Sequence, residues 1–310
     1  MSLFTAVIPC YNEQDNIADI YNEILKNEDY FKAHDIEPSI LFIDDGSSDE
    51  TVLRIKELAA EDSRVHMISF SRNFGKEAAI YAGLKEATGD YVAIMDADLQ
   101  DPPSLLPEMF DAIFNEDYDT VATRRVNRKG EPPVRSFFAR CFYKLMRKIS
   151  KTDIMDGARD FRLMKRSVVD AITDMNEYNR FSKGIFGWVG FKTKWIEFEN
   201  IKRNKGETKW SFWSLAAYSI EGIVAFSTAP LTFVSFIGLL FCVVAFLALI
   251  FVVLRALIFG DPVNGWPSMV SIIIFIGGIQ LLCLGIVGQY ISKVYLEVKD
   301  RPKYLVREKL

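Results

Sequence analysis

Cysteine and histidine are scarce in this chain of 310 residues, which contains four cysteines and two histidines. The cysteines, at positions 10, 141, 242 and 283, lack the paired spacing of a zinc site or a disulfide framework, which indicates a reducing compartment. Both glycine-rich sequences that cradle phosphates are also missing, G-x-G-x-x-G after a strand and G-x-x-x-x-G-K-[ST]. A bound nucleotide diphosphate would therefore have to be held by a metal ion and by basic side chains.

Acidic and basic residues are segregated along the chain, although the formal net charge is only -4. Residues 1–123 contain 26 Asp and Glu against 8 Lys and Arg, whereas residues 124–151 contain 10 Lys and Arg against the single acid Glu131. The second segment is expected to face an anion. Nucleic acid is the generic partner of such a segment, but the apolar stretches that follow favour anionic lipid head groups or a lipid phosphate, so no nucleic acid is expected.

Two long stretches contain no charged residue: Leu231–Leu254, of 24 residues, and Ser268–Ser292, of 25. Each can cross a hydrocarbon core of ~30 Å, so both are predicted to be transmembrane helices rather than a buried hairpin. The loop 256–267 has no Lys or Arg and the tail 293–310 has six, which places both termini in the cytoplasm. Because Met1–Ile8 has no basic residue and leads into a strand, no signal peptide is expected.

Short apolar runs alternate with amphipathic segments over the first 123 residues, a pattern typical of an α/β fold with a mainly parallel sheet. The predicted strands are Leu3–Ile8, Ser39–Ile43, Val65–Phe70, Tyr91–Met95 and Asp119–Thr123. Helices are predicted at about Asp15–Glu28, at residues 76–87 and at about Ser167–Met175. A further helix is predicted to begin at a capping box formed by Ser47 and Glu50. Ligands bind at the carboxyl ends of parallel strands. That edge is expected to collect Tyr11, Glu13, Asp44, Asp45, Lys76, Asp96 and Asp98.

An acidic motif follows the strand Tyr91–Met95, with Asp96 and Asp98 at its carboxyl end and Asp101-Pro102-Pro103 opening the next helix. Two carboxylates and the nearby amide oxygen of Gln100 offer the oxygen ligands that Mg²⁺ or Mn²⁺ prefers. The functional interpretation is a divalent ion that holds a diphosphate. An isolated pair of acids after a strand is more often part of a turn, but here other polar residues converge on the same edge.

Two segments have the composition of helices at a membrane surface. Val134–Ser150 interleaves apolar residues with cations, and a solvated helix packed on the domain is the alternative. Trp210–Phe226 has Glu221 as its only charged residue and is expected to lie along the interface. Trp188 and Trp195 are candidates for a sugar site, although a position in the core is the favoured prediction for both.

Five motifs, by their order and spacing, resemble the family 2 glycosyltransferases with a GT-A fold, and among them the polyprenyl-phosphate glycosyltransferases. They are Val7–Glu13, Ile43–Thr51, Asp96–Pro103, Asp160–Met164 and Arg203–Lys209. With two C-terminal spans, the chain looks most like bacterial enzymes that load glucose from UDP-glucose onto undecaprenyl phosphate (bactoprenol), and like two-span dolichol-phosphate mannose synthases. The resemblance implies a Rossmann-like GT-A domain over 1–209, an interfacial helix over 210–229, a transmembrane hairpin over 230–292 and a cytoplasmic basic tail over 293–310.

The resemblance also implies roles for individual residues. The nucleotide is expected to contact Pro9, Tyr11, Glu13, Asp44, Lys76, Asp96 and Ala97. Asp96, Asp98 and Gln100 match the metal and diphosphate motif, Arg203 and Lys209 match a basic pair near the phosphates, and Arg124, Arg128 and Arg135 match the arginines that receive the lipid phosphate. The implied catalytic residues are Asp160, Asp98 and Arg203. Asp160 matches the family's general base, but between two arginines it could equally be the centre of an ion-pair cluster.

The activity that the resemblance implies is inverting transfer of a sugar from a UDP-sugar to a polyprenyl phosphate for cell-envelope glycan modification. Overall similarity favours glucose as that sugar. Other donors stay open: GDP-mannose, UDP-N-acetylglucosamine, UDP-galactose and UDP-aminoarabinose. A polysaccharide synthase is disfavoured because the chain has no Q-x-x-R-W sequence, and an inactive membrane scaffold because Asp96 and Asp98 are both present. The protein is expected in the bacterial inner membrane with a cytoplasmic catalytic domain, and a homo-oligomer stays open.

Overall fold

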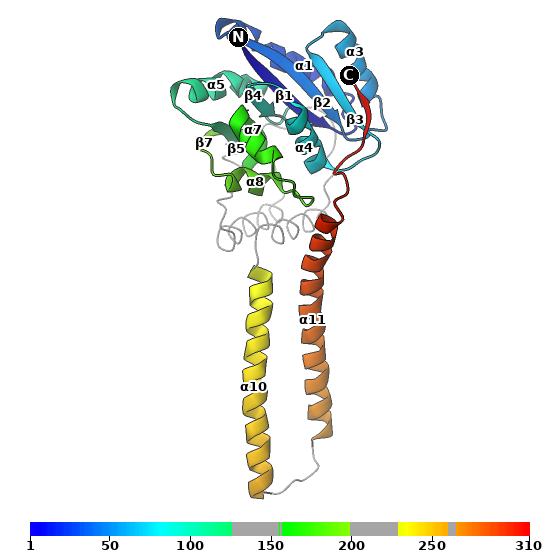
Figure 1. The fold of residues 1–310 in the computed structure, drawn as a ribbon, viewed down its shortest axis with the longest axis vertical. Helices are drawn as coiled ribbons and strands as arrows, with labels where there is room; N and C mark the ends of the chain where they lie inside the picture. The colour runs from blue at the N-terminus through cyan, green and yellow to red at the C-terminus, as the bar shows by residue number, and fades with distance from the viewer. Residues whose placement is uncertain (126–154, 156, 199–228, 260–264) are drawn as a thin grey trace.

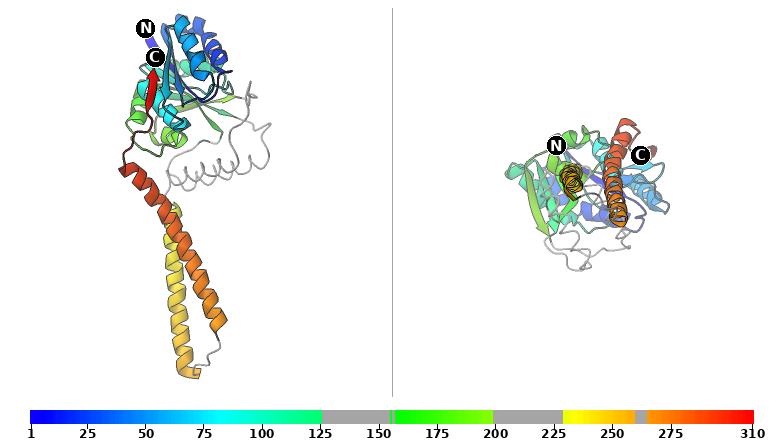
Figure 2. Two further views of the ribbon diagram at one scale, coloured as in Figure 1. Left: turned by 90° about the vertical axis from the view of Figure 1, so that its right-hand side faces the viewer. Right: turned by 90° about the horizontal axis from the view of Figure 1, so that it is seen from below.

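The protein consists of an α/β domain and two long helices that extend away from it side by side (Figures 1 and 2). The computed structural model describes residues 1–125, 155, 157–198, 229–259 and 265–310. Both chain termini lie in the α/β domain, because the last residues return to it after the second long helix (Figure 1).

In the described residues, eight strands form one sheet in the order β7-β5-β6-β4-β1-β2-β3-β8. Their bounds are β1 Ser2–Cys10, β2 Ile36–Asp44, β3 Val65–Phe70, β4 Tyr91–Ile94, β5 Thr120–Arg125, β6 Ala158–Lys165, β7 Thr193–Phe198 and β8 Val306–Lys309. Strands β4, β1, β2 and β3 run parallel, as do β5 and β7. Strand β6 is antiparallel to β4 and β5, and β8 is antiparallel to β3. The predicted mainly parallel sheet is therefore confirmed.

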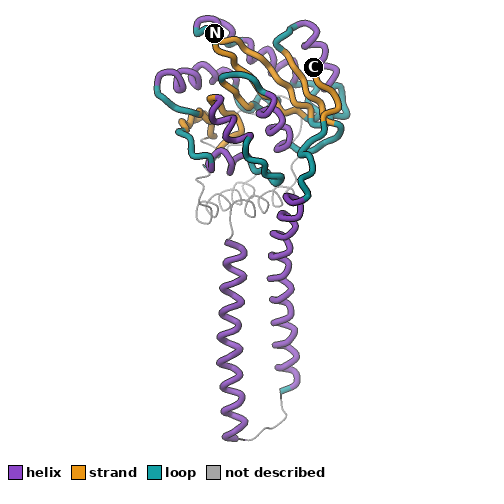
Figure 3. The backbone as a smooth tube through the Cα atoms, viewed as in Figure 1, coloured by secondary structure: helices purple, strands orange, loops and turns teal. Residues whose placement is uncertain are grey.

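Helices cover both faces of this sheet (Figure 3). One face carries α1 (Ile17–Leu25), α2 (Glu28–Ala33), α3 (Thr51–Glu61), the 3-10 turn η1 (Pro103–Leu105) and α5 (Leu106–Asn115). The other carries α4 (Lys76–Glu86), α7 (Arg166–Thr173) and α8 (Ser182–Trp188). Because both faces are buried, the central strands are almost continuous apolar runs.

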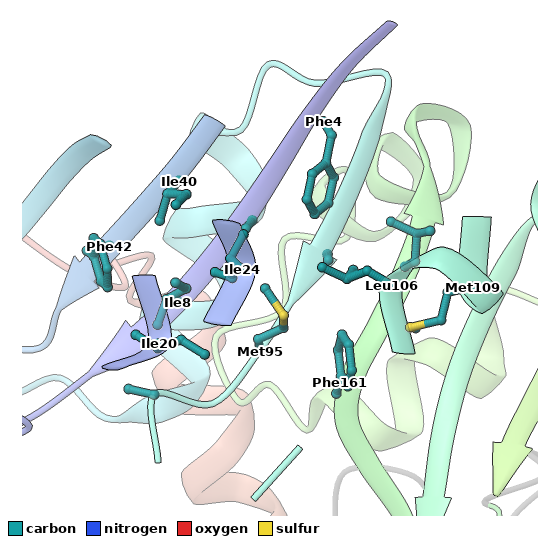
Figure 4. Close-up of a cluster of buried hydrophobic side chains, with 14 of the residues drawn as sticks. Phe4, Ile8, Ile20, Ile24, Ile40, Phe42, Met95, Leu106, Met109 and Phe161 are labelled. Atoms are coloured by element: carbon teal, nitrogen blue, oxygen red, sulfur yellow. The ribbon is translucent and has the colours of Figure 1, made fainter. Parts of the chain in front are cut away.

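The core on the α1 face is filled by large aliphatic and aromatic side chains (Figure 4). Phe4 on β1 lies fully buried with its ring centroid 5.2 Å from that of Phe110 on α5. Met95, which follows β4, and Phe161 on β6 fill the part of this core that is nearest the carboxyl edge of the sheet (Figure 4). The edge therefore has a rigid, close-packed floor.

The structure corrects two predictions about helices. The segment predicted as one helix, about Asp15–Glu28, is divided between α1 and α2. The predicted capping box is wrong, because α3 begins at Thr51 with Glu50 as its N-cap residue and no side-chain cap bond. The Ser47 hydroxyl instead accepts a hydrogen bond from the backbone N–H of Asn12 at 2.8 Å, which ties together the loops after β1 and β2.

The two long helices are α10 (Ala229–Phe259) and α11 (Trp266–Val298), of 31 and 33 residues. They touch through the rings of Phe241 and Phe275, whose centroids are 6.1 Å apart. Within the described residues, the stretch that is long and apolar enough to cross a membrane is Phe275–Val298, and Ala229–Phe241 is a shorter apolar stretch. Apart from residues 124, 125 and 229, the predicted basic segment 124–151 and the interfacial helix 210–229 lie outside the described residues.

The segment predicted as a basic tail, 293–310, is built into the rest of the protein. Its first residues, up to Val298, are the last turns of α11, and Val306–Lys309 form β8 at the edge of the sheet. Glu297 accepts hydrogen bonds from the backbone N–H of Tyr178 at 2.9 and 3.0 Å, and Lys293 donates to Asn179 at 2.8 Å. The end of α11 is therefore hydrogen-bonded to the loop between α7 and α8.

Candidate active site

The candidate active site lies at the carboxyl ends of β1, β2 and β4. Asp96 and Asp98 lie in the loop that follows β4, and Lys76 is the first residue of α4. Because β6 is antiparallel to β4 and Ile94 faces Arg162 in the register, the first half of β6 lies at the same edge and brings Asp160 beside the acidic motif. Three residues that the sequence predicted for the site, Lys76, Asp96 and Asp160, thus come together.

A single lysine ammonium bridges two carboxylates in this site. Lys76 Nζ lies 2.6 Å from Asp96 Oδ1 and 2.5 Å from Asp160 Oδ2. Burial alone would raise the pKa of Asp160, but Lys76, with help from Lys183 and Arg159, holds that pKa well below its usual range. Burial would lower the pKa of Lys76, yet Asp160 and Asp96 raise it well above its usual range. Lys76 and Asp160 are therefore both charged at neutral pH.

Arg159 forms a second cationic contact on the other side of the acidic motif. Its Nε donates to Asp101 Oδ1 at 2.7 Å, and its Nη2 lies 3.8 Å from Asp96 Oδ2. Asp101 is fully buried, and its Oδ2 has no hydrogen-bond partner among the described residues. Burial raises the pKa of Asp101, against the effect of Arg159. Arg159 therefore holds Asp101, at the end of the acidic loop, in place.

The loop that carries Asp98 is held in an uncommon backbone conformation. Leu99 has φ of 56°, in the left-handed region that residues other than glycine rarely adopt. Asp98 is 6% exposed, and its Oδ1 accepts the backbone N–H of Gln100 at 3.2 Å. Such local strain persists where the surroundings impose one geometry, and it concentrates at functional loops.

The donor set at this edge suits a hard divalent cation. Asp96 and Asp98 supply carboxylate oxygens, the ligand type of Mg²⁺ and Mn²⁺. No group of three or more His, Cys, Asp or Glu residues in the described part of the chain is arranged to hold a metal by itself. Mg²⁺ in proteins is commonly held by one or two carboxylates together with substrate phosphate oxygens and water. The predicted third ligand fits less well, because Gln100 Oε1 accepts from Arg125 at 2.8 Å and from Arg159 at 3.4 Å.

The loop after β2 is organised by two neighbouring aspartates. Asp44 is fully buried, and its carboxylate accepts from the Ser47 backbone N–H at 3.0 Å and from the Ser69 hydroxyl at 2.6 Å. Asp45 accepts from the backbone N–H groups of Phe74 at 2.6 Å and Gly75 at 2.9 Å. Burial raises the pKa of Asp45 to about 6. Asp45 thus shapes the loop that leads into Lys76.

The remaining residues predicted for the nucleotide lie near this loop. Pro9 is in β1 opposite Ile43, and Tyr11 is 37% exposed just beyond the strand. The Glu13 carboxylate accepts from Asn16 at 2.6 Å. Ala97 is buried between the two acids of the motif. These positions leave the Tyr11 ring accessible at the edge of the sheet.

The predicted phosphate-binding cations are only partly described. Arg124, at the end of β5, forms an ion pair with Glu197 on β7. Arg128, Arg135, Arg203 and Lys209 lie outside the described residues. The prediction that Trp188 lies in the core is wrong, because this side chain is 63% exposed, and Trp195 is half-buried on β7.

The motifs predict no site role for Arg159 or Arg125, although the structure places both against the acidic motif. The position of each arginine in the sequence could have indicated that it belongs to the site. Arg159 directly precedes Asp160, and Arg125 follows Arg124 at the start of the basic segment. Their partners Asp101 and Gln100 are 58 and 25 residues away, so the contacts themselves depend on the pairing of β5, β6 and β4.

The fold and its acidic edge are those of a GT-A glycosyltransferase. Residues 5–173 match the family described as Glycosyl transferase family 2. The chain belongs to this family. It is 42% identical to the prophage bactoprenol glucosyl transferase homolog of Escherichia coli (strain K12), over 97% of each chain. It is 40% identical to the bactoprenol glucosyl transferase of Shigella phage SfX, over 98% of each chain.

Two further comparisons extend this picture. A Bacillus subtilis (strain 168) protein named as a glycosyltransferase, CsbB, is 45% identical over 99% of this chain and 92% of its own. Among solved structures, glucosyl-3-phosphoglycerate synthase from Mycobacterium tuberculosis in complex with Mn²⁺, UDP-glucose and phosphoglyceric acid is 18% identical, with a TM-score of 0.49 over 72% of this chain and 78% of that chain.

Proposed function

We propose that this glycosyltransferase moves glucose from UDP-glucose to a polyprenyl phosphate, with inversion at C1 of the sugar. The names of two relatives that match nearly the whole chain, at 42% and 40% identity, support glucose and bactoprenol as the substrates. The product would be a polyprenyl-phosphate glucose, a donor for the modification of cell-envelope glycans.

The reaction requires one nucleophilic displacement at the sugar. An oxygen of the acceptor phosphate attacks C1, the bond from C1 to the diphosphate oxygen breaks, and its electron pair leaves with UDP. A phosphate monoester has its second pKa at about 6, so the acceptor is largely dianionic at neutral pH. No proton has to be removed as it attacks. The main task of the site is then to hold two anionic phosphate groups close together.

The charges at the sheet edge suit this task. Asp96 and Asp98 would hold Mg²⁺ or Mn²⁺, which when bound would neutralise charge on the departing diphosphate. Lys76, placed between Asp96 and Asp160, supplies a cation at the same edge. We assign Arg203 and Lys209 to the diphosphate and Arg124, Arg128 and Arg135 to the acceptor phosphate, as the family resemblance implies. Arginine suits the phosphates because its planar fork can bind two oxygens at once.

Asp160 is assigned as a positioning residue rather than as a general base. A general base works best when its pKa lies near the working pH. Lys76 holds the pKa of Asp160 far below that range, and the pair is in contact at 2.5 Å. The bridging contact of Lys76 to both Asp96 and Asp160 is the observation that carries this proposal, because it links the metal-binding motif to the residue expected near the acceptor.

We further propose that the chain crosses the bacterial inner membrane twice and that its catalytic domain is cytoplasmic. The apolar stretch Phe275–Val298 supports one span, and the uncharged run Leu231–Leu254 within α10 supports the other. Six Lys and Arg in the tail 293–310 favour a cytoplasmic side for the domain to which that tail returns. The acceptor phosphate would then meet the site at the inner membrane surface.

A panel of labelled nucleotide sugars tests the substrate assignment. The purified full-length protein is incubated with undecaprenyl phosphate and, in turn, UDP-glucose, UDP-galactose, UDP-N-acetylglucosamine, UDP-aminoarabinose and GDP-mannose, and label in the lipid phase is counted. Label from UDP-glucose should enter that phase fastest. Faster transfer from another donor would identify the sugar of that donor, rather than glucose, as the substrate. No lipid-phase label from any donor, with polymer instead or no product, would favour a polysaccharide synthase or an inactive scaffold.

A further inference from the structure

The C-terminal strand β8 lies at the edge of the sheet, beside β3 (Figure 2). The backbone N–H of Ser71 donates to the Leu305 carbonyl at 2.9 Å, and Met67 and Leu310 exchange backbone hydrogen bonds of 2.8 and 3.1 Å. The ring of Tyr304 stacks on that of Phe70 with centroids 4.9 Å apart. Bonds at both ends of the strand hold it in a defined register against β3.

A cavity of about 380 Å³ lies between β8, α3 and the carboxyl ends of β2 and β3. Its polar lining includes Asp44, Ser47, Lys56, Ser69, Ser71 and Arg307. The bond from the Asn12 N–H to the Ser47 hydroxyl joins this lining to the loop after β1. The cavity is therefore continuous with the loops that, under the proposed function, surround the nucleoside of the donor.

Arg307 is the residue of β8 whose charge is available to a ligand in this cavity. Glu308 is paired with Lys56 at 2.7 Å, and Lys309 is paired with Glu86 at 2.5 Å. Arg307 is exposed and lines the cavity, and its guanidinium forms no ion pair or hydrogen bond with another residue of the described part of the chain. A guanidinium group supplies only donors, so the complementary group on a ligand is an acceptor oxygen.

We infer that this cavity receives the base of the donor nucleotide and that Arg307, from the C-terminal strand, binds a carbonyl oxygen of that base. The inference rests on the proposed UDP-sugar donor. The pairing edge of uracil presents two carbonyl acceptors on either side of one N–H. Arg307 donates to a carbonyl, while Asp44 and the hydroxyls of Ser69 and Ser71 offer acceptors for the N–H. The donor site is thus assembled from the first strands of the chain and from the strand that follows α11.

The test compares Arg307→Ala with Lys309→Ala in the full-length protein in lipid nanodiscs. Lys309 lies on the same strand and forms an exposed ion pair, so its replacement is a matched control for any loss of β8 docking. Calorimetry should show that Arg307→Ala weakens UDP binding by roughly tenfold, the effect of losing one hydrogen bond to a charged group, while Lys309→Ala binds like wild type. KM for UDP-glucose should rise, and KM for polyprenyl phosphate should stay within about twofold.

A second measurement needs no variant. Phenylglyoxal modifies accessible arginines, and mass spectrometry of wild-type protein should show that UDP protects Arg307 whereas undecaprenyl phosphate does not. Wild-type affinity for UDP in Arg307→Ala, or equal modification of Arg307 with and without UDP, would overturn the inference and leave glucose transfer intact. A wild-type protein that binds no UDP would overturn the proposed donor itself.

Discussion

Replacing Lys76 by Met should damage both stability and turnover, because Lys76 is the ammonium between Asp96 and Asp160. The two aspartate side chains are 18% and 15% exposed, so neither can be fully hydrated in place. Removing one partner of a buried ion pair costs about 3–5 kcal/mol. The Lys76 side chain is 39% exposed, and screening reduces this cost to about 2 kcal/mol. A domain of this size should then melt ~4–8 °C lower.

The loss of stability should depend on pH with a defined sign. In the wild type, burial alone would raise the pKa of Asp160, but Lys76 holds it below the unfolded value, so the pair adds stability above pH ~4 and loses it as the pH falls further. Without Lys76, burial raises the pKa of Asp160. The difference in melting temperature between wild type and Lys76→Met should therefore be largest near pH 7 and shrink toward pH ~4.

Thermal unfolding of the detergent-solubilised protein, followed by intrinsic fluorescence from pH 4 to 8, measures this difference. Lys76→Arg keeps the charge and should recover most of the stability. Lys26→Met breaks an exposed pair with Glu23 and should change little. Turnover of Lys76→Met should fall by about a hundredfold, as for loss of a preorganised cation in an active site. A melting difference that is the same at pH 4 and pH 7, or unchanged turnover, would refute this account of Lys76.

Four further predictions concern the metal, the acceptor and the topology. Asp98→Asn should lose most turnover while the domain keeps its melting temperature, and full activity of this variant in excess chelator would rule out the metal site. Asp160→Asn should lower kcat and leave the pH–rate profile unchanged in shape; a wild-type ionisation that disappears in this variant would make Asp160 a base. Arg135→Ala should mainly raise KM for the lipid, and a selective rise in KM for UDP-glucose would contradict the assignment. A cysteine introduced at Asn264 should react with an impermeant thiol reagent in intact cells, and protection there, beside positive controls, would reverse the proposed topology.

The central sheet could be predicted from the sequence because its strands are short apolar runs ended by polar loops. The predicted Val65–Phe70 is β3 as observed, and the other four strands differ at their ends by a few residues. Strand β6 was not predicted, because Arg159, Asp160 and Arg162 place charges on both of its faces. Those charges are compensated inside the fold: Arg162 is 3% exposed and its guanidinium stacks 3.5 Å from the ring centroid of Phe186. The pattern of apolar residues does not reveal a strand whose charged side chains belong to an active site.

The remaining contacts of the site could not be predicted because they depend on pairing between strands that are far apart in the sequence. Lys76 and Asp160 are 84 residues apart, and they meet only because β6 runs antiparallel beside β4. The motifs predicted that Lys76 and Asp96 lie at one edge, but not that one ammonium contacts both aspartates. Strand β8 escaped prediction for a related reason. Its four residues are mostly exposed and polar, and its partner β3 lies more than 230 residues earlier in the chain.

The identity of the broken bond tests the central claim most directly. The purified protein is given UDP-glucose and undecaprenyl phosphate, and the nucleotide and lipid products are identified by mass spectrometry and ³¹P NMR. Attack of the acceptor phosphate on C1 predicts UDP and a polyprenyl monophosphate carrying glucose in the β configuration, formed in equal amounts. Release of UMP with a polyprenyl diphosphate sugar would mean attack on phosphorus, and an α-linked product would exclude a single inverting displacement; either result would contradict the mechanism proposed for this site.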